Sequence, residues 1–165
     1  MKLKIYTDGS CKGNGSSNSR GGWAFVFINE EEENILKLSG GELNTTNNRM
    51  ELTAVIEAIR IAEIFAKSHR VIYCEIYTDS AYIHNCIKQK WYKNWESNGW
   101  ITSKKTPVLN KDLWIQLVPY FEDARFDFFK VKGHTGKQDW NDMVDKLAQS
   151  AAEKAIELEE EKWVI

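Results

Sequence analysis

Ile5-Tyr6-Thr7-Asp8 near the N-terminus occurs a second time in the middle of the chain, as Ile76-Tyr77-Thr78-Asp79. Each copy ends a run of β-branched and aromatic residues and precedes small, turn-forming residues, which is typical of a buried strand that runs into a turn. We therefore predict strands over residues 3–8 and 71–79, each with an aspartate at its carboxyl end. Parallel pairing would place both carboxylates at the edge where open α/β sheets bind ligands. For either copy alone, an aspartate that only begins a turn is the simpler interpretation.

Length and composition indicate a globular protein with one domain over residues 1–165. Apolar residues make up 42% and charged residues 28% of the chain, and no apolar run has the length of a signal peptide or a membrane span. The three cysteines lack metal-binding spacing, which predicts reduced thiols and a cytoplasmic location. The net charge of −2 weighs mildly against a nucleic-acid partner, so the local distribution of charge has to decide.

The hydrophobic pattern predicts an α/β fold with a mixed sheet. Strands over residues 22–28 and 35–43 would form an antiparallel meander with the first strand, and residues 9–22 a long hairpin loop. Because a strand follows this glycine-rich loop, it does not fit a dinucleotide-binding motif. A helix from Asn48 would allow the parallel crossover to the second copy of the repeat. Further helices are predicted over residues 80–88 and 111–121 and from residue 140 or 141, with a last strand over 125–131.

Glu51 is the only charged residue in the apolar arc of the helix predicted to begin at Asn48. On a helical wheel it lies in the middle of that arc, which runs through Met50, Ala54, Val55, Ala58, Ile59, Ile61, Ala62, Phe65 and Ala66. A carboxylate facing the packed side is costly unless it is paired, protonated or bound to metal. A capping box with Asn48 is the alternative, but a cap does not require that face. We therefore predict that Glu51 is a site residue.

Two more candidates lie near the C-terminus. Asp145 is expected in the first turn of the last helix, at the margin of its apolar stripe, although an interaction with the helix dipole alone is the alternative. His134 lies between glycines in a loop, where its pKa suits proton transfer; a solvated surface histidine is the alternative. Four acids can thus converge in the fold. Carboxylates that lie close together bind Mg²⁺ or Mn²⁺. Two such ions would activate a water molecule and stabilise the leaving oxygen in phosphodiester hydrolysis. The four acids are Asp8, Glu51, Asp79 and Asp145.

Residues 88–105 concentrate positive charge and aromatic rings. They hold five lysines against one acid, Glu96, and the rings of Trp91, Tyr92, Trp95 and Trp100 lie between them. This combination suits a nucleic-acid backbone, whereas the alternative is tryptophans packed on the core with solvated lysines. The local excess of lysine favours nucleic acid. Residues 157–165, with four glutamates among the first five, are expected to be a frayed or solvated helix end.

Several of these segments resemble the signatures of the type 1 ribonuclease H family. They are Tyr6 to Cys11, Thr45 to Leu52, Thr78 to Ser80 and Val131 to His134, with Asn141, Asp145 and Leu147-Ala148 matching the last motif. The resemblance covers nearly the whole chain. It implies a five-stranded mixed sheet, three strands antiparallel and the rest parallel, flanked by helices. It also implies cleavage of the RNA strand of RNA–DNA hybrids with 5′-phosphate and 3′-hydroxyl products, two Mg²⁺ ions on the four acids, and assistance from His134.

The resemblance also implies substrate-binding residues. Positions at the RNA minor groove and its 2′-hydroxyls are matched by Cys11, Asn14, Asn47 and Asn48. Thr46 matches the residue that anchors a DNA phosphate. Trp91 and Trp95 belong to a handle that holds the DNA strand, and Asn141 belongs to the last motif. In that handle, Glu96-Ser97-Asn98 replaces the basic cluster of many bacterial relatives, which predicts a weak salt dependence.

The predicted function is a monomeric hybrid nuclease without membrane association, and two other functions are alternatives to it. An integrase or resolvase of the same superfold is disfavoured by the Asn47-Asn48 pair and the tryptophan-rich handle. A non-catalytic hybrid-binding module would be indicated by a missing acid, and all four acids are present.

Overall fold

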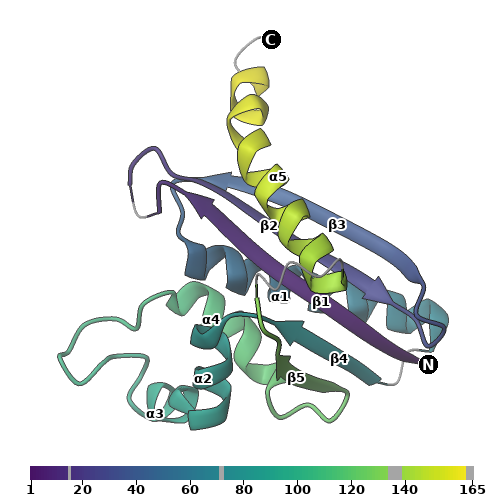
Figure 1. Cartoon of the computed structure of the whole chain (residues 1–165). Coiled ribbons are helices and arrows are strands. Elements are labelled where there is room, and N and C mark those ends of the chain that lie inside the picture. Colours follow the sequence, from purple (N-terminus) through teal and green to yellow (C-terminus); the bar gives the residue numbers. More distant parts are fainter. Residues whose placement is uncertain (15, 71–72, 134–138, 163–165) are drawn as a thin grey trace.

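A five-stranded mixed sheet forms the centre of the protein, as the computed structural model shows (Figure 1). The structure describes residues 1–14, 16–70, 73–133 and 139–162, with side chains up to residue 155. The strands are β1 (Lys2–Lys12), β2 (Arg20–Ile28), β3 (Asn34–Leu43), β4 (Tyr73–Thr78) and β5 (Phe126–Lys130). Their order is β3-β2-β1-β4-β5, with antiparallel pairing from β1 to β3 and parallel pairing of β1 with β4 and β4 with β5. The predicted fold class is confirmed.

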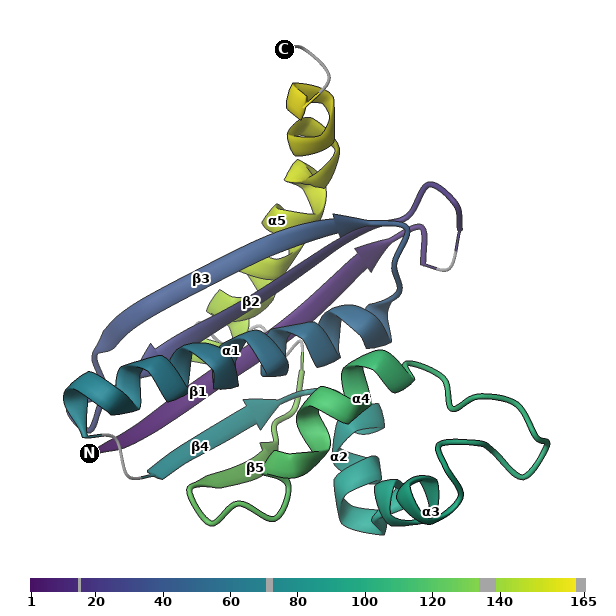
Figure 2. The ribbon, with the colours of Figure 1, turned by 180° about the vertical axis from the view of Figure 1, so that it is seen from behind.

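Helices cover both faces of this sheet. α1 (Asn47–His69) lies across one face and α5 (Trp140–Lys162) across the other, as the two opposite views show (Figures 1 and 2). α2 (Ala81–Gln89), α3 (Trp91–Ser97), α4 (Lys111–Leu117) and a 3₁₀ turn (Val118–Tyr120) complete the layer on the α1 side. In the part of the chain that the structure describes, no helix has the length and hydropathy to cross a membrane.

The two copies of the repeated sequence are direct neighbours. In the parallel register of β1 and β4, Ile5 pairs with Ile76 and Tyr6 with Tyr77. Since side chains alternate along a strand, both isoleucines are buried in the core under α1, whereas the two tyrosine rings stack on the α5 side with centroids 4.7 Å apart. The predicted parallel pairing is therefore correct, and Asp8 and Asp79 follow at one edge of the sheet.

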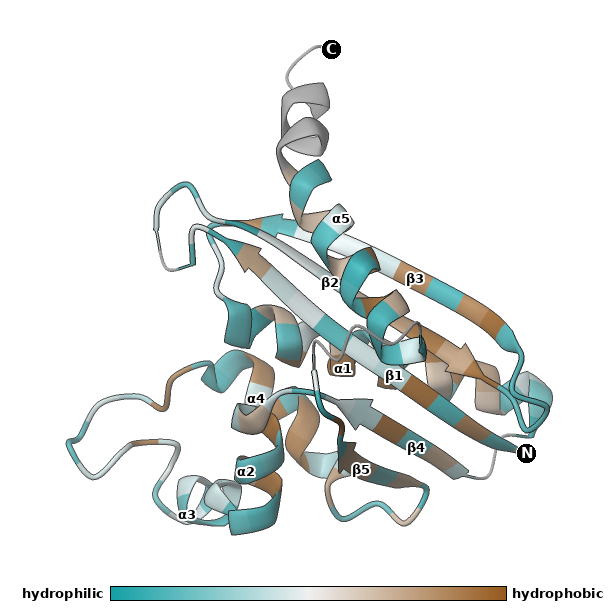
Figure 3. Cartoon of the chain, in the orientation of Figure 1, coloured by the Kyte–Doolittle hydropathy of each residue, from teal (hydrophilic) through white to brown (hydrophobic). Residues whose placement is uncertain are grey.

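The main core lies between the sheet and α1. Brown, hydrophobic positions run continuously along the C-terminal half of β2 in Figure 3, and the buried face of α1 contributes Leu52, Val55, Ala58, Ile59 and Ala62. The other face packs against small residues of α5, because Ala148, Ala151 and Ala152 are buried there. Gly22 of β2 permits this close approach, since a Cβ there would lie 2.0 Å from the carbonyl oxygen of Ala148.

Several predicted boundaries are wrong. β1 continues to Lys12 and β2 begins at Arg20, so half of the loop predicted over residues 9–22 is paired strand. α1 begins at Asn47 with Thr46 as its N-cap, whose Oγ1 accepts the N–H of Arg49 at 3.2 Å. Asn48 is therefore not the cap, because Thr46 supplies an equally suitable oxygen two residues earlier. α4 ends at Leu117, before residue 121, and a 3₁₀ turn containing Pro119 follows.

Candidate active site

Three carboxylates meet where β1 loses its parallel neighbour. Asp8 lies on β1, Asp79 follows the end of β4, and Glu51 projects from α1; one oxygen of each lies within 4.8 Å of the others. Asp8 does not end its strand as predicted, because β1 extends four residues further along β2 alone. The parallel pairing with β4 ends before Asp8, however, so both aspartates lie at the carboxyl edge of the parallel part of the sheet.

Glu51 reaches this edge because α1 lies directly against β1. Gly9 makes this possible, since a Cβ there would lie 2.3 Å from the backbone nitrogen of Glu51. With Thr46 as the cap, Glu51 lies in the second turn of α1 and cannot form the predicted alternative capping box. Its side chain points toward the sheet, and its buried Oε2 has no hydrogen-bond partner among the residues described. Such an atom requires a proton or a cation.

The mutual repulsion of these acids appears in their pKa values. Burial, followed by the charge of Glu51 and contacts with Asp145 and Asp79, raises the pKa of Asp8 to about 12. Burial and the neighbouring Asp79 also raise the pKa of Glu51 well above its ordinary value. Both shifts favour the protonated form, and a bound cation would reverse them because it stabilises the carboxylates. Protons and a divalent cation would therefore compete for this site.

Asp145 is the fourth acid, and it approaches from the opposite face of the sheet. It lies in the second turn of α5, one turn later than predicted, and its Oδ2 accepts a hydrogen bond from Gln149 at 3.0 Å. A hydrogen bond with Asp145 contributes to the raised pKa of Asp8, so the two side chains are in contact. The structure thus brings all four predicted acids together from two strands and two helices.

The donor set fits a hard divalent cation. All the available ligand atoms are carboxylate oxygens, which Mg²⁺ and Mn²⁺ prefer, and the unpartnered Oε2 of Glu51 offers a lone pair inside the cluster. Asp8, Glu51, Asp79 and Asp145 are the residues that would hold such ions.

A pocket of about 480 Å³ opens beside the cluster. Its lining includes Asn47 and Asn48 of α1, both predicted site residues, together with Glu51, Asp79, Ser80, Ala81, Tyr82 and Gly133. Ser80 and Tyr82 were not predicted. The sequence contained a signal for Ser80, because a serine directly after a strand-terminal aspartate commonly caps the next helix, and its Oγ accepts the N–H of Ile83 at 3.2 Å.

The remaining residues predicted near the RNA strand gather around the start of α1. Asn14 Oδ1 accepts the backbone N–H of Asn47 at 2.7 Å, and the Cys11 thiol donates to the carbonyl of Thr45 at 3.5 Å. Thr46, which lies between Thr45 and Asn47 in the chain, is the N-cap of α1. Residues from the β1–β2 hairpin and from α1 therefore form one continuous surface next to the pocket.

The aromatic and basic segment packs its tryptophan rings on the core and exposes its lysines. Trp91 and Trp95 are half-buried against the core, and the ring of Trp95 lies 5.5 Å from that of Trp114. The interpretation as core packing is therefore correct for these two rings. All five lysines of residues 88–105 are exposed. Contact of this segment with nucleic acid remains a prediction.

Two other predicted residues have different outcomes. His134 lies outside the described residues. Asn141 is buried at the start of α5, where its Nδ2 donates to the carbonyl of Lys132 at 3.5 Å. Its Oδ1 is also buried, without a partner in the described part of the chain. Asn141 therefore lies beside Lys132, two residues after the end of β5, and its contact with substrate remains a prediction.

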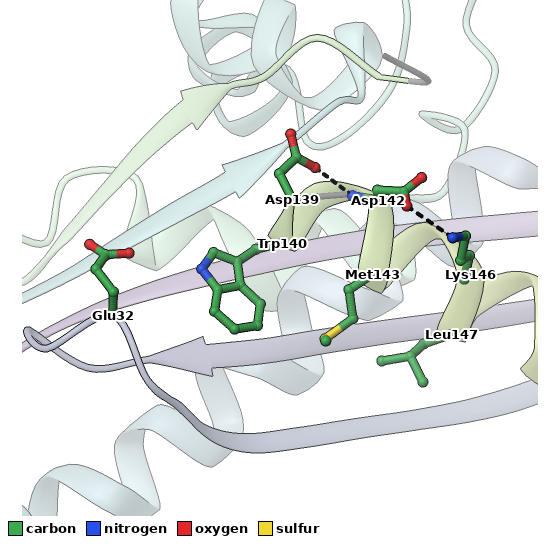
Figure 4. A pocket seen from close by; sticks show the side chains of 7 residues that line it. All are labelled: Glu32, Asp139, Trp140, Asp142, Met143, Lys146 and Leu147. Atoms are coloured by element: carbon green, nitrogen blue, oxygen red, sulfur yellow. Dashed lines mark hydrogen bonds and ion pairs between the residues drawn. The ribbon is translucent and has the colours of Figure 1, made fainter. Parts of the chain in front are cut away.

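A larger groove, of about 840 Å³, has none of the four acids among its described lining residues. Figure 4 shows the side chains that line it. The groove runs between the first turns of α5 and the β2–β3 turn, where Trp140, Met143 and Leu147 supply its apolar surface. The charges on its rim are largely paired with each other or with neighbours, as in the 3.1 Å contact between Lys146 and Asp142 and the 2.8 Å contact between Glu32 and Lys4. This groove therefore offers mainly apolar contacts. The acid cluster, which has closely spaced carboxylates, is the candidate active site.

Comparisons with known proteins identify the family of this chain. The RNase H family model matches residues 1–153. Ribonuclease H of Syntrophomonas wolfei is 44% identical over 150 residues, covering 91% of this chain and 95% of the relative. Ribonuclease H of Clostridium botulinum is 40% identical over 153 residues, covering 93% and 97%.

Solved structures give the same result. LC9-RNase H1, described as a type 1 RNase H with the type 2 active-site motif, is 28% identical with a TM-score of 0.75, covering 93% of this chain and 73% of that protein. LC11-RNase H1, solved in complex with an RNA/DNA hybrid, shares the fold at 22% identity with a TM-score of 0.68, covering 93% and 99%. This chain therefore belongs to the RNase H family.

Proposed function

We propose that this protein is an endonuclease that hydrolyses the RNA strand of RNA–DNA hybrids, leaving 5′-phosphate and 3′-hydroxyl ends. The cofactors would be two Mg²⁺ ions, with Mn²⁺ as a possible substitute. The observation that carries the proposal is the group of three carboxylates within 4.8 Å at the sheet edge of an RNase H family chain. Carboxylates held this close in a buried position are unfavourable in a purely structural role, so a cationic ligand accounts for them.

The four acids would bind the ions. When bound, two ions would activate a water molecule and stabilise the leaving oxygen of the phosphodiester. Asp8 is 2% exposed and is influenced by the other three acids, so it is central to the cluster. His134, which precedes α5 in the sequence, would accept and return protons during the reaction.

The hybrid would be recognised by the surface around the start of α1. Cys11, Asn14, Asn47 and Asn48 would contact the RNA minor groove, where recognition of the 2′-hydroxyl distinguishes RNA from DNA. Thr46 would anchor a DNA phosphate. Because its Oγ1 already accepts the N–H of Arg49, its hydroxyl proton is available for donation to a phosphate oxygen.

The DNA strand would extend toward the aromatic and basic segment. Trp91 and Trp95 would fix the segment to the core while its exposed lysines approach phosphates. Asn141 would contact the substrate from the start of α5. We also propose one domain that acts as a monomer in the cytoplasm; the free thiols of all three cysteines support a reducing location.

The decisive experiment offers the protein labelled RNA–DNA, RNA–RNA and DNA–DNA duplexes, each with Mg²⁺, Mn²⁺ or EDTA. We expect cutting of the RNA strand in the hybrid alone, and only with a divalent ion. Cleavage of either homoduplex at a comparable rate would contradict the proposed substrate. Cleavage in EDTA would contradict the proposed metal dependence.

A further inference from the structure

A buried serine connects the β1–β2 hairpin to the start of α1. Ser19 is fully buried although it lies at the end of an otherwise exposed turn. Its Oγ accepts the backbone N–H of Thr45 at 2.8 Å and donates to the carbonyl of the same residue at 2.8 Å. Its own carbonyl accepts the N–H of Asn44 at 3.0 Å. Three hydrogen bonds thus join the hairpin to the two residues that precede the N-cap of α1.

A second connection lies on the outside of the same hairpin. Asn14 is exposed, and its Oδ1 accepts the backbone N–H of Asn47, the first residue of α1, at 2.7 Å. Because the first N–H groups of a helix have no partner within it, this bond caps the helix as well as fixing the amide of Asn14. With Oδ1 engaged, Asn14 presents its two N–H donors to a ligand.

The two connections depend on each other. The hairpin turn between Asn14 and Ser19 is fixed to residues 44–47 at its buried end and its exposed end. Without the hydroxyl of Ser19, both bonds from Ser19 to Thr45 are lost. The backbone bond from Asn44 to Ser19 and the 3.5 Å bond from the Cys11 thiol to Thr45 remain, so the position of Asn14 relative to Asn47 depends more on the exposed bond between them. An exposed hydrogen bond competes with water and gives little rigidity alone.

We propose that Ser19 is a positioning residue for recognition of the RNA strand: its hydroxyl holds Asn14 and Asn47 in the relative position that binds the hybrid. Ser19 itself is buried and does not contact substrate. The inference rests on the proposed function, because it assigns Ser19 to the RNA-reading surface of that same site. Asp8 and Glu51 lie further along β1 and α1, and none of the described hydrogen bonds joins their side chains to Ser19. Substrate binding should therefore depend on Ser19 while the chemical step does not.

The test measures kcat and KM of Ser19→Ala on an RNA–DNA hybrid in Mg²⁺. We expect KM to rise about five- to tenfold with kcat within about twofold of wild type. Ser16→Ala is the matched control, because the Ser16 hydroxyl bonds only within the turn, to the carbonyl of Gly13 at 2.7 Å. It should leave both constants unchanged. Hydrogen exchange at the Asn47 amide should accelerate in Ser19→Ala but not in Ser16→Ala.

A double-mutant cycle separates positioning from general destabilisation. If Ser19 acts through Asn14, Ser19→Ala added to Asn14→Ala should raise KM less than about twofold further. An unchanged KM in Ser19→Ala, equal losses in kcat and KM, or full additivity with Asn14→Ala would each overturn the proposal. Failure of the wild type to cut the hybrid would instead overturn the proposed function. The two failures are therefore distinguishable.

Discussion

Replacing Asp8 with asparagine should stabilise the metal-free protein at neutral pH while it abolishes hydrolysis. In the folded protein the pKa of Asp8 is raised from 3.8 to about 12, chiefly by burial and by the charge of Glu51. The folded state therefore keeps a proton that the unfolded chain releases above pH 3.8. The stability contribution of this proton is fully present below that pH and is lost progressively as pH rises toward the folded pKa.

The size of the effect follows from this shift. Each pH unit above 3.8 lowers the free energy of unfolding by about 1.36 kcal/mol, so the penalty at pH 7 is at most roughly 4 kcal/mol. Asn cannot ionise, and Asp8→Asn should remove the penalty. Because the neighbouring pocket admits water and counter-ions, we expect a measured gain of about 1–3 kcal/mol at pH 7 and almost none at pH 4.

Urea unfolding in EDTA between pH 4 and pH 8 measures this difference. Mg²⁺ should raise the stability of the wild type, because ligands that bind only the folded state stabilise it, and it should stabilise Asp8→Asn much less. Asp112→Asn is a control of opposite sign, since Arg49, at 2.7 Å, lowers the pKa of Asp112. It should be destabilising at pH 7 and neutral in acid. A destabilised Asp8→Asn, or a gain independent of pH, would refute the reasoning.

Three more perturbations test other parts of the site. Glu51→Gln should lower kcat in Mg²⁺ by at least about a hundredfold. Its affinity for the hybrid in EDTA, measured by gel-shift titration, should change less than about threefold. A kcat equal to that of the wild type would show that Glu51 is not part of a metal site. Gly9→Ala should lower the free energy of unfolding by about 3 kcal/mol or more, since its Cβ would lie 2.3 Å from the backbone of α1, and a urea midpoint near wild type would contradict this packing. The slope of log affinity against log salt should be shallower than about −4, and a steeper slope would show that Glu96 does not weaken phosphate contacts.

The central elements were predictable because each has a local signal that tertiary structure did not override. The repeated sequence predicted parallel neighbours, and the helical wheel placed Glu51 on the packed face. The paired extension of β1 to Lys12 was missed because Gly9 and Ser10 have little β propensity and pair only because β2 lies opposite them. The connection made by Ser19 had no signal, because its partner lies 26 residues away and only the folded chain brings them together.

The register of the repeated sequence has a consequence for the order of folding. Thr7 and Tyr77, which are joined by a hydrogen bond across β1 and β4, lie 70 residues apart in the chain. The β1–β2–β3 meander needs only local contacts, whereas this pairing closes a long loop and is intrinsically slow. A nascent chain that has formed only its meander holds Asp8 without Asp79 or Asp145. Under the proposed function, the metal site would therefore be complete only after β4 has paired with β1 and α5 has packed on the sheet.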